Sequence, residues 1–147
     1  MKESAPLQMK RIAALAILLL ASCATIPNSA EDRAAAVRAA LRDLGSGETI
    51  RTLVIKGPEL RAALAGKVAV ISEADVPQTE TESLPRGYAK LLSIDIAGNH
   101  GTMRLLAGPV PKASAGEMQL ACGTTYTFAL DRDENGWRAT ITGVAVC

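Results

Sequence analysis

Aromatic side chains and excess charge are both scarce in this sequence. Of its 147 residues 48% are hydrophobic, but 26 are alanine and only four are aromatic: Tyr88, Tyr126, Phe128 and Trp137. The length predicts one domain, and the alanine-rich composition predicts a modest core. Lysine and arginine number 16 against 15 aspartates and glutamates, a net charge of +1, and the longest basic run is Lys10-Arg11. We therefore expect no nucleic-acid partner, because a polyanion requires a clustered basic surface.

Residues of the common catalytic and metal sites are equally rare. His100 is the only histidine, and it lies in a glycine-flanked turn. There is no Gly-x-Ser-x-Gly motif and no glycine-rich phosphate loop. We therefore expect no catalytic residue, no cofactor and no zinc site. Glu80 and Glu82 could in principle act as an acid and a base, but a polar loop bounded by prolines is a poor place to raise a carboxyl pKa.

One segment matches the opening of an EF-hand calcium loop. Asp131, Asp133 and Asn135 alternate along the chain, and Gly136 follows them. The match then fails, because Thr142 occupies the position of the bidentate acid and the flanking residues predict strands rather than helices. We therefore predict a hairpin turn here rather than a metal site.

No hydrophobic run is long enough to cross a membrane as an ordinary helix. The run from Ile12 to Ala21 follows Lys10-Arg11. As a helix it would rise only about 15 Å, against about 30 Å of bilayer hydrocarbon. A positive segment, a short apolar run and small residues after it are the layout of a secretory signal. Met9 begins a more conventional signal than Met1, so two start sites are open.

The end of this run, Leu20-Ala21-Ser22-Cys23, resembles the lipobox of bacterial lipoproteins, a leucine, two small residues and a cysteine. The resemblance covers residues 1–23 only. It implies that the Cys23 thiol receives a diacylglycerol, that signal peptidase II cleaves between Ser22 and Cys23, and that the new amine is acylated, for example with palmitate. Two or three acyl chains anchor a protein stably, whereas one holds it only marginally.

This resemblance also determines the organisation that we expect. Residues 1–22 would be the signal peptide, 23–30 a lipidated tether, and 31–147 a single domain. Ala24 is not the aspartate that retains many such lipoproteins in the inner membrane. The expected location is therefore the outer membrane, with the domain facing the periplasm. An ordinary signal peptide with a chance cysteine is the alternative.

Hydrophobic periodicity in the mature part predicts an α+β fold. Ser29 and Asp32 are typical of a helix start and Gly45 of its end, and between them one face carries Ala34, Val37, Ala40, Leu41 and Leu44. A short helix is predicted over Pro58–Leu64. Strands are predicted over 50–55, 67–71, 88–96, 102–107, 119–130 and 137–146. We expect the amphipathic helix to pack on an antiparallel sheet of about four to six strands.

The last two strands form the clearest hairpin. Tyr126, Phe128 and Leu130 alternate with threonines, which predicts one buried face and one wetter face. A Leu130–Trp137 pairing places Cys122 diagonally from Cys147, and a tighter Asp133–Gly136 pairing places the two cysteines directly opposite each other. Either register puts both on one face, within or near the Cα separation of about 4.4 to 6.8 Å of a disulfide. We predict a Cys122–Cys147 bridge, with two free thiols as the alternative.

These features predict a lipid-anchored envelope protein whose non-catalytic domain binds a protein or a small ligand, at the sheet face or beside the acidic loop 72–86. The alternative is an envelope hydrolase that uses carboxylates as acid and base. A helix followed by a curved sheet resembles the nuclear-transport-factor-like cone fold, which hosts both binders and enzymes, but the analogy assigns no residue. A deep pocket holding an acid beside His100 would favour the hydrolase, and a shallow sheet with scattered acids would favour the binder.

Overall fold

The computed structural model describes residues 28–44, 50–66, 68–77, 84–108 and 123–146 of the chain. The signal segment with its cleavage site Ser22-Cys23, most of the tether, Glu80 and Glu82, and the predicted disulfide partners Cys122 and Cys147 lie outside these ranges. Within the described ranges, neither α-helix has the length and hydropathy that a membrane crossing requires.

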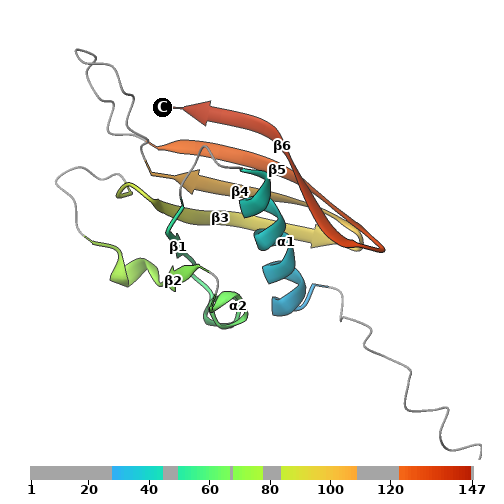
Figure 1. Cartoon of the computed structure of the whole chain (residues 1–147), viewed down its shortest axis with the longest axis horizontal. Helices are drawn as coiled ribbons and strands as arrows, with labels where there is room; N and C mark the ends of the chain where they lie inside the picture. Colours follow the sequence, from blue (N-terminus) through green and yellow to red (C-terminus); the bar gives the residue numbers. More distant parts are fainter. Residues whose placement is uncertain (1–27, 45–49, 67, 78–83, 109–122, 147) are drawn as a thin grey trace, which may run out of the picture.

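The described chain forms one six-stranded sheet, with helix α1 lying across one of its faces and α2 beside α1 (Figure 1). The strand order is β2-β1-β3-β4-β5-β6. The strands are β1 Thr52–Val54, β2 Ala69–Ile71, β3 Tyr88–Ala97, β4 His100–Ala107, β5 Thr124–Asp133 and β6 Gly136–Val146, and the helices are α1 Ala30–Asp43, α2 Pro58–Leu64 and the 3₁₀ turn η2 Glu73–Asp75. The α+β class predicted from the sequence is confirmed.

The sheet is mixed, so the prediction of an antiparallel sheet was wrong. Strand β1 pairs in parallel with both β2 and β3, and the other three strand pairs are antiparallel. The chain passes through α2 between β1 and β2, which supplies the long crossover that two parallel neighbours need. It then returns past β1 to begin β3. Hydrophobic alternation marks a strand but does not encode the direction of its neighbour, and this is why the error arose.

Helix α1 covers the sheet with an alanine-rich face. Ser29 is its N-cap, and the Ser29 hydroxyl accepts a hydrogen bond from the backbone N–H of Asp32, the two residues that indicated a helix start. Ala34, Val37 and Ala40 are fully buried. Because most of these side chains are small, each buries little apolar area, and the helix needs further attachment to the sheet.

The core lies between the helices and the sheet. Phe128 and Leu130 on β5 and Met103 and Leu105 on β4 are at most 1% exposed and belong to the same cluster as the buried side chains of α1 and α2. The buried face predicted for Phe128 and Leu130 is therefore confirmed. The threonines of the other face of the hairpin are half-buried or exposed: Thr125, Thr127, Thr140 and Thr142.

The β5–β6 hairpin has the tighter of the two predicted turns. Asp133 pairs with Gly136, whose φ of 107° is readily adopted only by glycine. A bulge at Thr127–Phe128, which was not predicted, shifts the register by one residue towards the open end of the hairpin. The last described pair is Thr124 with Val146. The predicted disulfide lies beyond this pair, outside the described residues, and stays a prediction.

A buried carboxylate joins α1 to this hairpin. Asp32 is 3% exposed, and its Oδ1 accepts hydrogen bonds from Arg132 Nη1 at 3.0 Å and Trp137 Nε1 at 2.8 Å. Its Oδ2 accepts a bond from the backbone N–H of Asn28 at 3.1 Å. Arg132 and Trp137 are cross-strand partners, and the guanidinium carbon lies 5.9 Å from the indole ring centre, within cation–π range. One side chain thus connects the first turn of α1 to the last two strands.

Replacing Asp32 with alanine should lower the free energy of unfolding by about 3 to 5 kcal/mol, because it removes the buried acceptor that Arg132 and Trp137 share. Urea unfolding followed by circular dichroism measures this loss. Glu31→Ala is the matched control, since the Glu31 side chain is 71% exposed and lies 3.8 Å from Arg38. It should cost less than about 1 kcal/mol. Equal losses in the two variants would contradict the anchoring role of Asp32.

Candidate functional site

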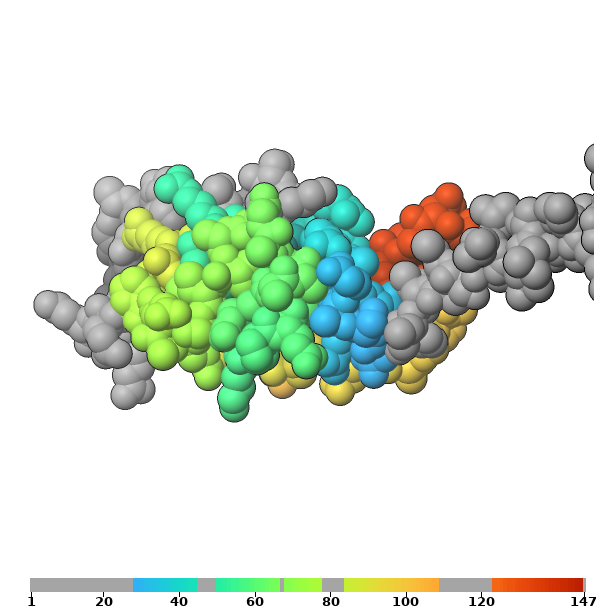
Figure 2. All heavy atoms as spheres, turned by 90° about the horizontal axis from the view of Figure 1, so that it is seen from below, coloured from blue at the N-terminus to red at the C-terminus, as the bar shows by residue number. Residues whose placement is uncertain are grey.

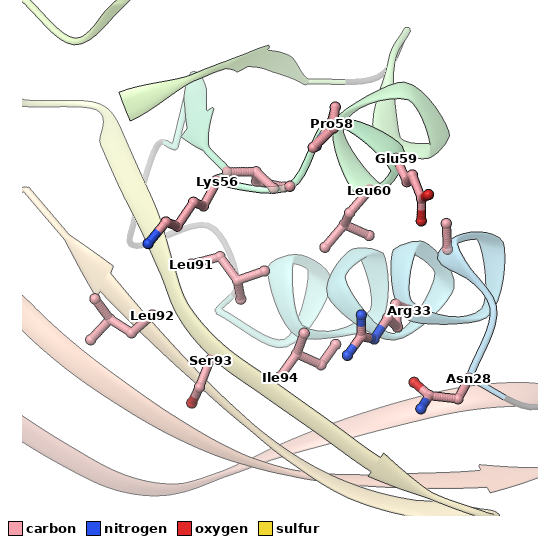
Figure 3. A pocket seen from close by; sticks show the side chains of 13 residues that line it. Asn28, Arg33, Lys56, Pro58, Glu59, Leu60, Leu91, Leu92, Ser93 and Ile94 are labelled. Carbon is pink, nitrogen blue, oxygen red and sulfur yellow. The ribbon is translucent and has the colours of Figure 1, made fainter. Parts of the chain in front are cut away.

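A hollow of about 360 Å³ opens between the start of α1, the link from β1 into α2, and strand β3 (Figure 3). This volume falls within the range of small-molecule sites, roughly 300 to 1,000 Å³. Figure 2 shows α1 and α2 side by side on the outside of the molecule. The apolar lining is mainly Ile55, Leu60, Leu91, Leu92 and Ile94, and the polar side chains are Asn28, Arg33, Lys56, Glu59 and Ser93. The hollow is therefore amphipathic.

A β-bulge shapes the floor of the hollow. In the pairing of β3 with β4, Leu91 lies opposite Leu105 and Ser93 opposite Arg104, so Leu92 is an extra residue without a partner. The extra residue keeps Leu91 and Ile94 on the same, helix-covered face although they are three positions apart. It also leaves Leu92 42% exposed at the rim.

The link from β1 into α2 forms the opposite wall. Gly57 is the N-cap of α2 and Pro58 begins its first turn, where the missing N–H of proline leaves no bond unmade. Arg61 Nη1 donates to the backbone carbonyl of Ile55 at 3.1 Å, which holds the link against the helix that follows it. Lys56, Gly57 and Pro58 therefore reach the hollow from a fixed turn.

Arg33 is the side chain of the hollow whose hydrogen bonding is incomplete in the described part of the chain. It projects from the first turns of α1 into the space beside Ile94 (Figure 3). Its Nε is shielded from solvent and has no hydrogen-bond partner among the described residues. The other two charged side chains of the lining are Lys56 and Glu59, and no ion pair joins either to Arg33 among the described residues. A guanidinium in this position is suited to a planar anion such as a carboxylate or a phosphate.

The structure places an acid beside the single histidine of the sequence, but outside the hollow. His100 Nδ1 lies 2.7 Å from Asp131 Oδ1, because the two residues are direct partners in the β4–β5 ladder. Their side chains are 80% and 57% exposed, and neither lines the hollow. This pair therefore lacks the water-excluding cavity that would favour acid–base catalysis.

The calcium-like segment folds as the predicted hairpin turn. Asp133 Oδ1 accepts a bond from the backbone N–H of Asn135 at 2.8 Å, and its Oδ2 lies 2.6 Å from Arg138 Nη2. Asp131 is bound to His100. Within the described ranges, no three His, Cys, Asp or Glu side chains converge in a way that could hold a metal ion.

The described part of the acidic loop is engaged with its own neighbours. Glu73 pairs with Lys90 on β3, and this hydrogen bond and charge hold the pKa of Glu73 below its ordinary value. Asp75 accepts bonds from the hydroxyl and the backbone N–H of Ser72, which lower the pKa of Asp75 in the same way. Glu80 and Glu82 lie outside the described residues.

No residue of the hollow was predicted as a site residue from the sequence. Arg33 lies outside the apolar face predicted for the helix, and 88–96 were predicted as a regular strand. One signal was present: Ala89 and Leu91 alternate in one phase, whereas Leu92, Ile94 and Ile96 alternate in the other. Such a change of phase inside a strand is typical of a bulge. The rest of the lining comes from segments distant in the chain and has no local signature.

Comparisons with known proteins supply no function that could be transferred to this chain. No protein-family profile, no curated protein sequence and no solved structure matches it. The site is therefore interpreted from its own geometry.

The Glu73–Lys90 pair predicts a pH effect. A carboxyl whose pKa is lowered in the folded state adds stability above its ordinary pKa of about 4.5, and this contribution is lost as the pH falls through the lower folded value. In Lys90→Met the pKa of Glu73 should rise, as followed by NMR titration of the side-chain carboxyl. Asp75, whose pKa is lowered by Ser72, is the internal control and should not move. An unchanged Glu73 titration would contradict the pairing.

Proposed function

We propose that this chain is a lipid-anchored protein of the cell envelope, held at the outer membrane with its domain facing the periplasm, and that the domain binds a ligand or partner rather than catalysing a reaction. The observation that carries the binding proposal is the amphipathic hollow with the unsatisfied Arg33. Pockets of this size with an apolar lining and a few polar groups are the usual form of a small-molecule site.

The anchor is supported by the lipobox-like segment and by its distance from the fold. Cys23 precedes Asn28, the first described residue, by five positions. Five residues span at most about 18 Å, since an extended chain advances about 3.3 to 3.6 Å per residue. Asn28 itself lines the hollow. A lipid on Cys23 would therefore hold the hollow close to the membrane surface.

The hydrolase is the less supported function. Acid–base hydrolysis with carboxylates needs two of them across a shared cavity. Among the described residues that line the hollow, Glu59 is the single carboxylate. The His100–Asp131 pair lies elsewhere, on an exposed part of the sheet.

The anchor predicts the form of the mature protein. Cys23→Ser should leave the precursor uncleaved and without diacylglycerol, because serine lacks the thiol that accepts the lipid. Membrane fractionation and mass spectrometry of the N-terminal peptide measure both effects. Ser22→Ala, which keeps a small residue before the cysteine, should be processed and lipidated normally. A wild-type protein that starts elsewhere, or starts with an unmodified Cys23, would overturn the proposal.

The periplasm would also oxidise the predicted Cys122–Cys147 pair. We expect a non-reducing peptide map to show the two cysteines linked. Reduction should lower the free energy of unfolding by about 3 kcal/mol, as for a loop of this length. A matched alkylation before and after reductant is the control. Two cysteines that are both alkylated without reductant would contradict the bridge.

A further inference from the structure

The inference starts from Arg33, whose Nε has no hydrogen-bond partner among the residues that the structure describes. A shielded donor without an acceptor lowers stability, and folded proteins pair nearly all such groups. Arg33 also carries a full charge that no ion pair among the described residues balances. A ligand that brings a negatively charged oxygen to this guanidinium would supply the missing counter-charge.

Apolar side chains continue the hollow beyond Arg33. Figure 3 shows Leu60 from α2 and Leu91 and Ile94 from β3 converging on one space. Leu92 extends this surface to the rim and is 42% exposed. Leu60 and Ile94 are only 8% and 9% exposed, so the apolar surface that a hydrocarbon group could still cover belongs mainly to Leu91 and Leu92. A free phosphate or other small ion would satisfy Arg33 and leave this surface uncovered.

The other charged side chains of the lining influence which ligand charge the hollow prefers. Lys56 lies towards Leu91 and Leu92, and Glu59 lies on the side of Asn28 and Arg33 (Figure 3). In the described lining, two positive side chains against one negative side chain give the hollow a positive balance. Glu59 is exposed and unpaired with Arg33, so its charge opposes an anion without excluding it.

We infer that the hollow binds an anionic amphiphile, with a carboxylate or phosphate head at Arg33 and a short hydrocarbon tail over Leu91 and Leu92. This inference rests on the proposed binding function and names its ligand class. The proposed anchor at Cys23 would place the hollow beside a membrane, which is a source of such molecules. The head group distinguishes a fatty acid from a phosphate-bearing lipid fragment.

A photoreactive octanoate carrying a diazirine tests the inference on the full lipidated chain in phosphatidylcholine nanodiscs. Irradiation followed by peptide mass spectrometry should show saturable labelling of peptides that contain Leu60 or 91–94. Octanoate or octyl phosphate should displace the label, and the stronger of the two identifies the head group. 1-Octanol and inorganic phosphate should compete at least about tenfold more weakly, because each lacks half of the recognised chemistry.

Three variants test whether the labelling depends on the charged side chains of the hollow. Arg33→Gln should reduce labelling about tenfold or more, whereas Arg42→Gln, which removes the same charge from an exposed position of α1, should leave labelling unchanged. Glu59→Gln should increase labelling about two- to fivefold. Without ligand, Arg33→Gln should melt no lower than Arg42→Gln, because no hydrogen bond of the Nε is lost. A lower melting temperature would assign Arg33 a structural role instead.

The outcomes separate this inference from the function on which it rests. Equal competition by 1-octanol, or labelling that Arg33→Gln does not reduce, would overturn the anionic ligand class and leave a binding hollow. The absence of saturable labelling in the hollow would overturn ligand binding at this site. The lipid anchor is decided separately by the N-terminal peptide of the same sample.

Discussion

The buried carboxylate of Asp32 is the interaction on which the arrangement of this domain depends. Helix α1 presents mostly alanines to the sheet, and such a face buries little area and can slide or rotate at small cost. Asp32 removes that freedom, because it accepts hydrogen bonds from Arg132 and Trp137 on two adjacent strands and from the backbone of Asn28. A buried charge is tolerated only when it is paired in this way.

The same constraint places the hollow. Successive residues of a helix point about 100° apart, so a helix that directs Asp32 at the β5–β6 hairpin directs Arg33 to one side of it. On that side lie β3 and α2, and the space between them is the hollow. The bulge at Leu92 then brings Leu91 and Ile94, which alternate in different phases along β3, to the same face, where they form the apolar floor of the hollow. Attachment and candidate binding thus come from neighbouring residues in one helical turn.

A short tether to the expected lipid anchor would suit a domain that binds its ligand close to the membrane. Asn28, the first described residue, follows the expected lipidation site by five positions and lines the hollow. His100 and Asp131 are engaged with each other, Glu73 and Asp75 of the loop are engaged with Lys90 and Ser72, and none of the four lines the hollow. The groups of the described lining that a ligand could meet are the charged side chains of Arg33, Lys56 and Glu59 and the apolar side chains beside them.

The sequence by itself determined the local structure of this protein. Ser29, Pro58 and Gly136 indicated where α1, α2 and the last turn begin or end, because caps and turns depend on the backbone preferences of a few adjacent residues. The alternation of Phe128 and Leu130 indicated the buried face of β5 for the same reason. The expected lipid anchor also rests on a linear motif.

Only the tertiary structure decided the direction of β1, the partners of Asp32 and the existence of the hollow. The parallel pairing of β1 depends on the path of the crossover, and Arg132 meets Asp32 across 100 residues of chain. Arg33, Glu59 and Leu91 likewise meet because three elements pack together. Local periodicity reports which face of an element is buried, but it carries no information about which distant segment covers that face.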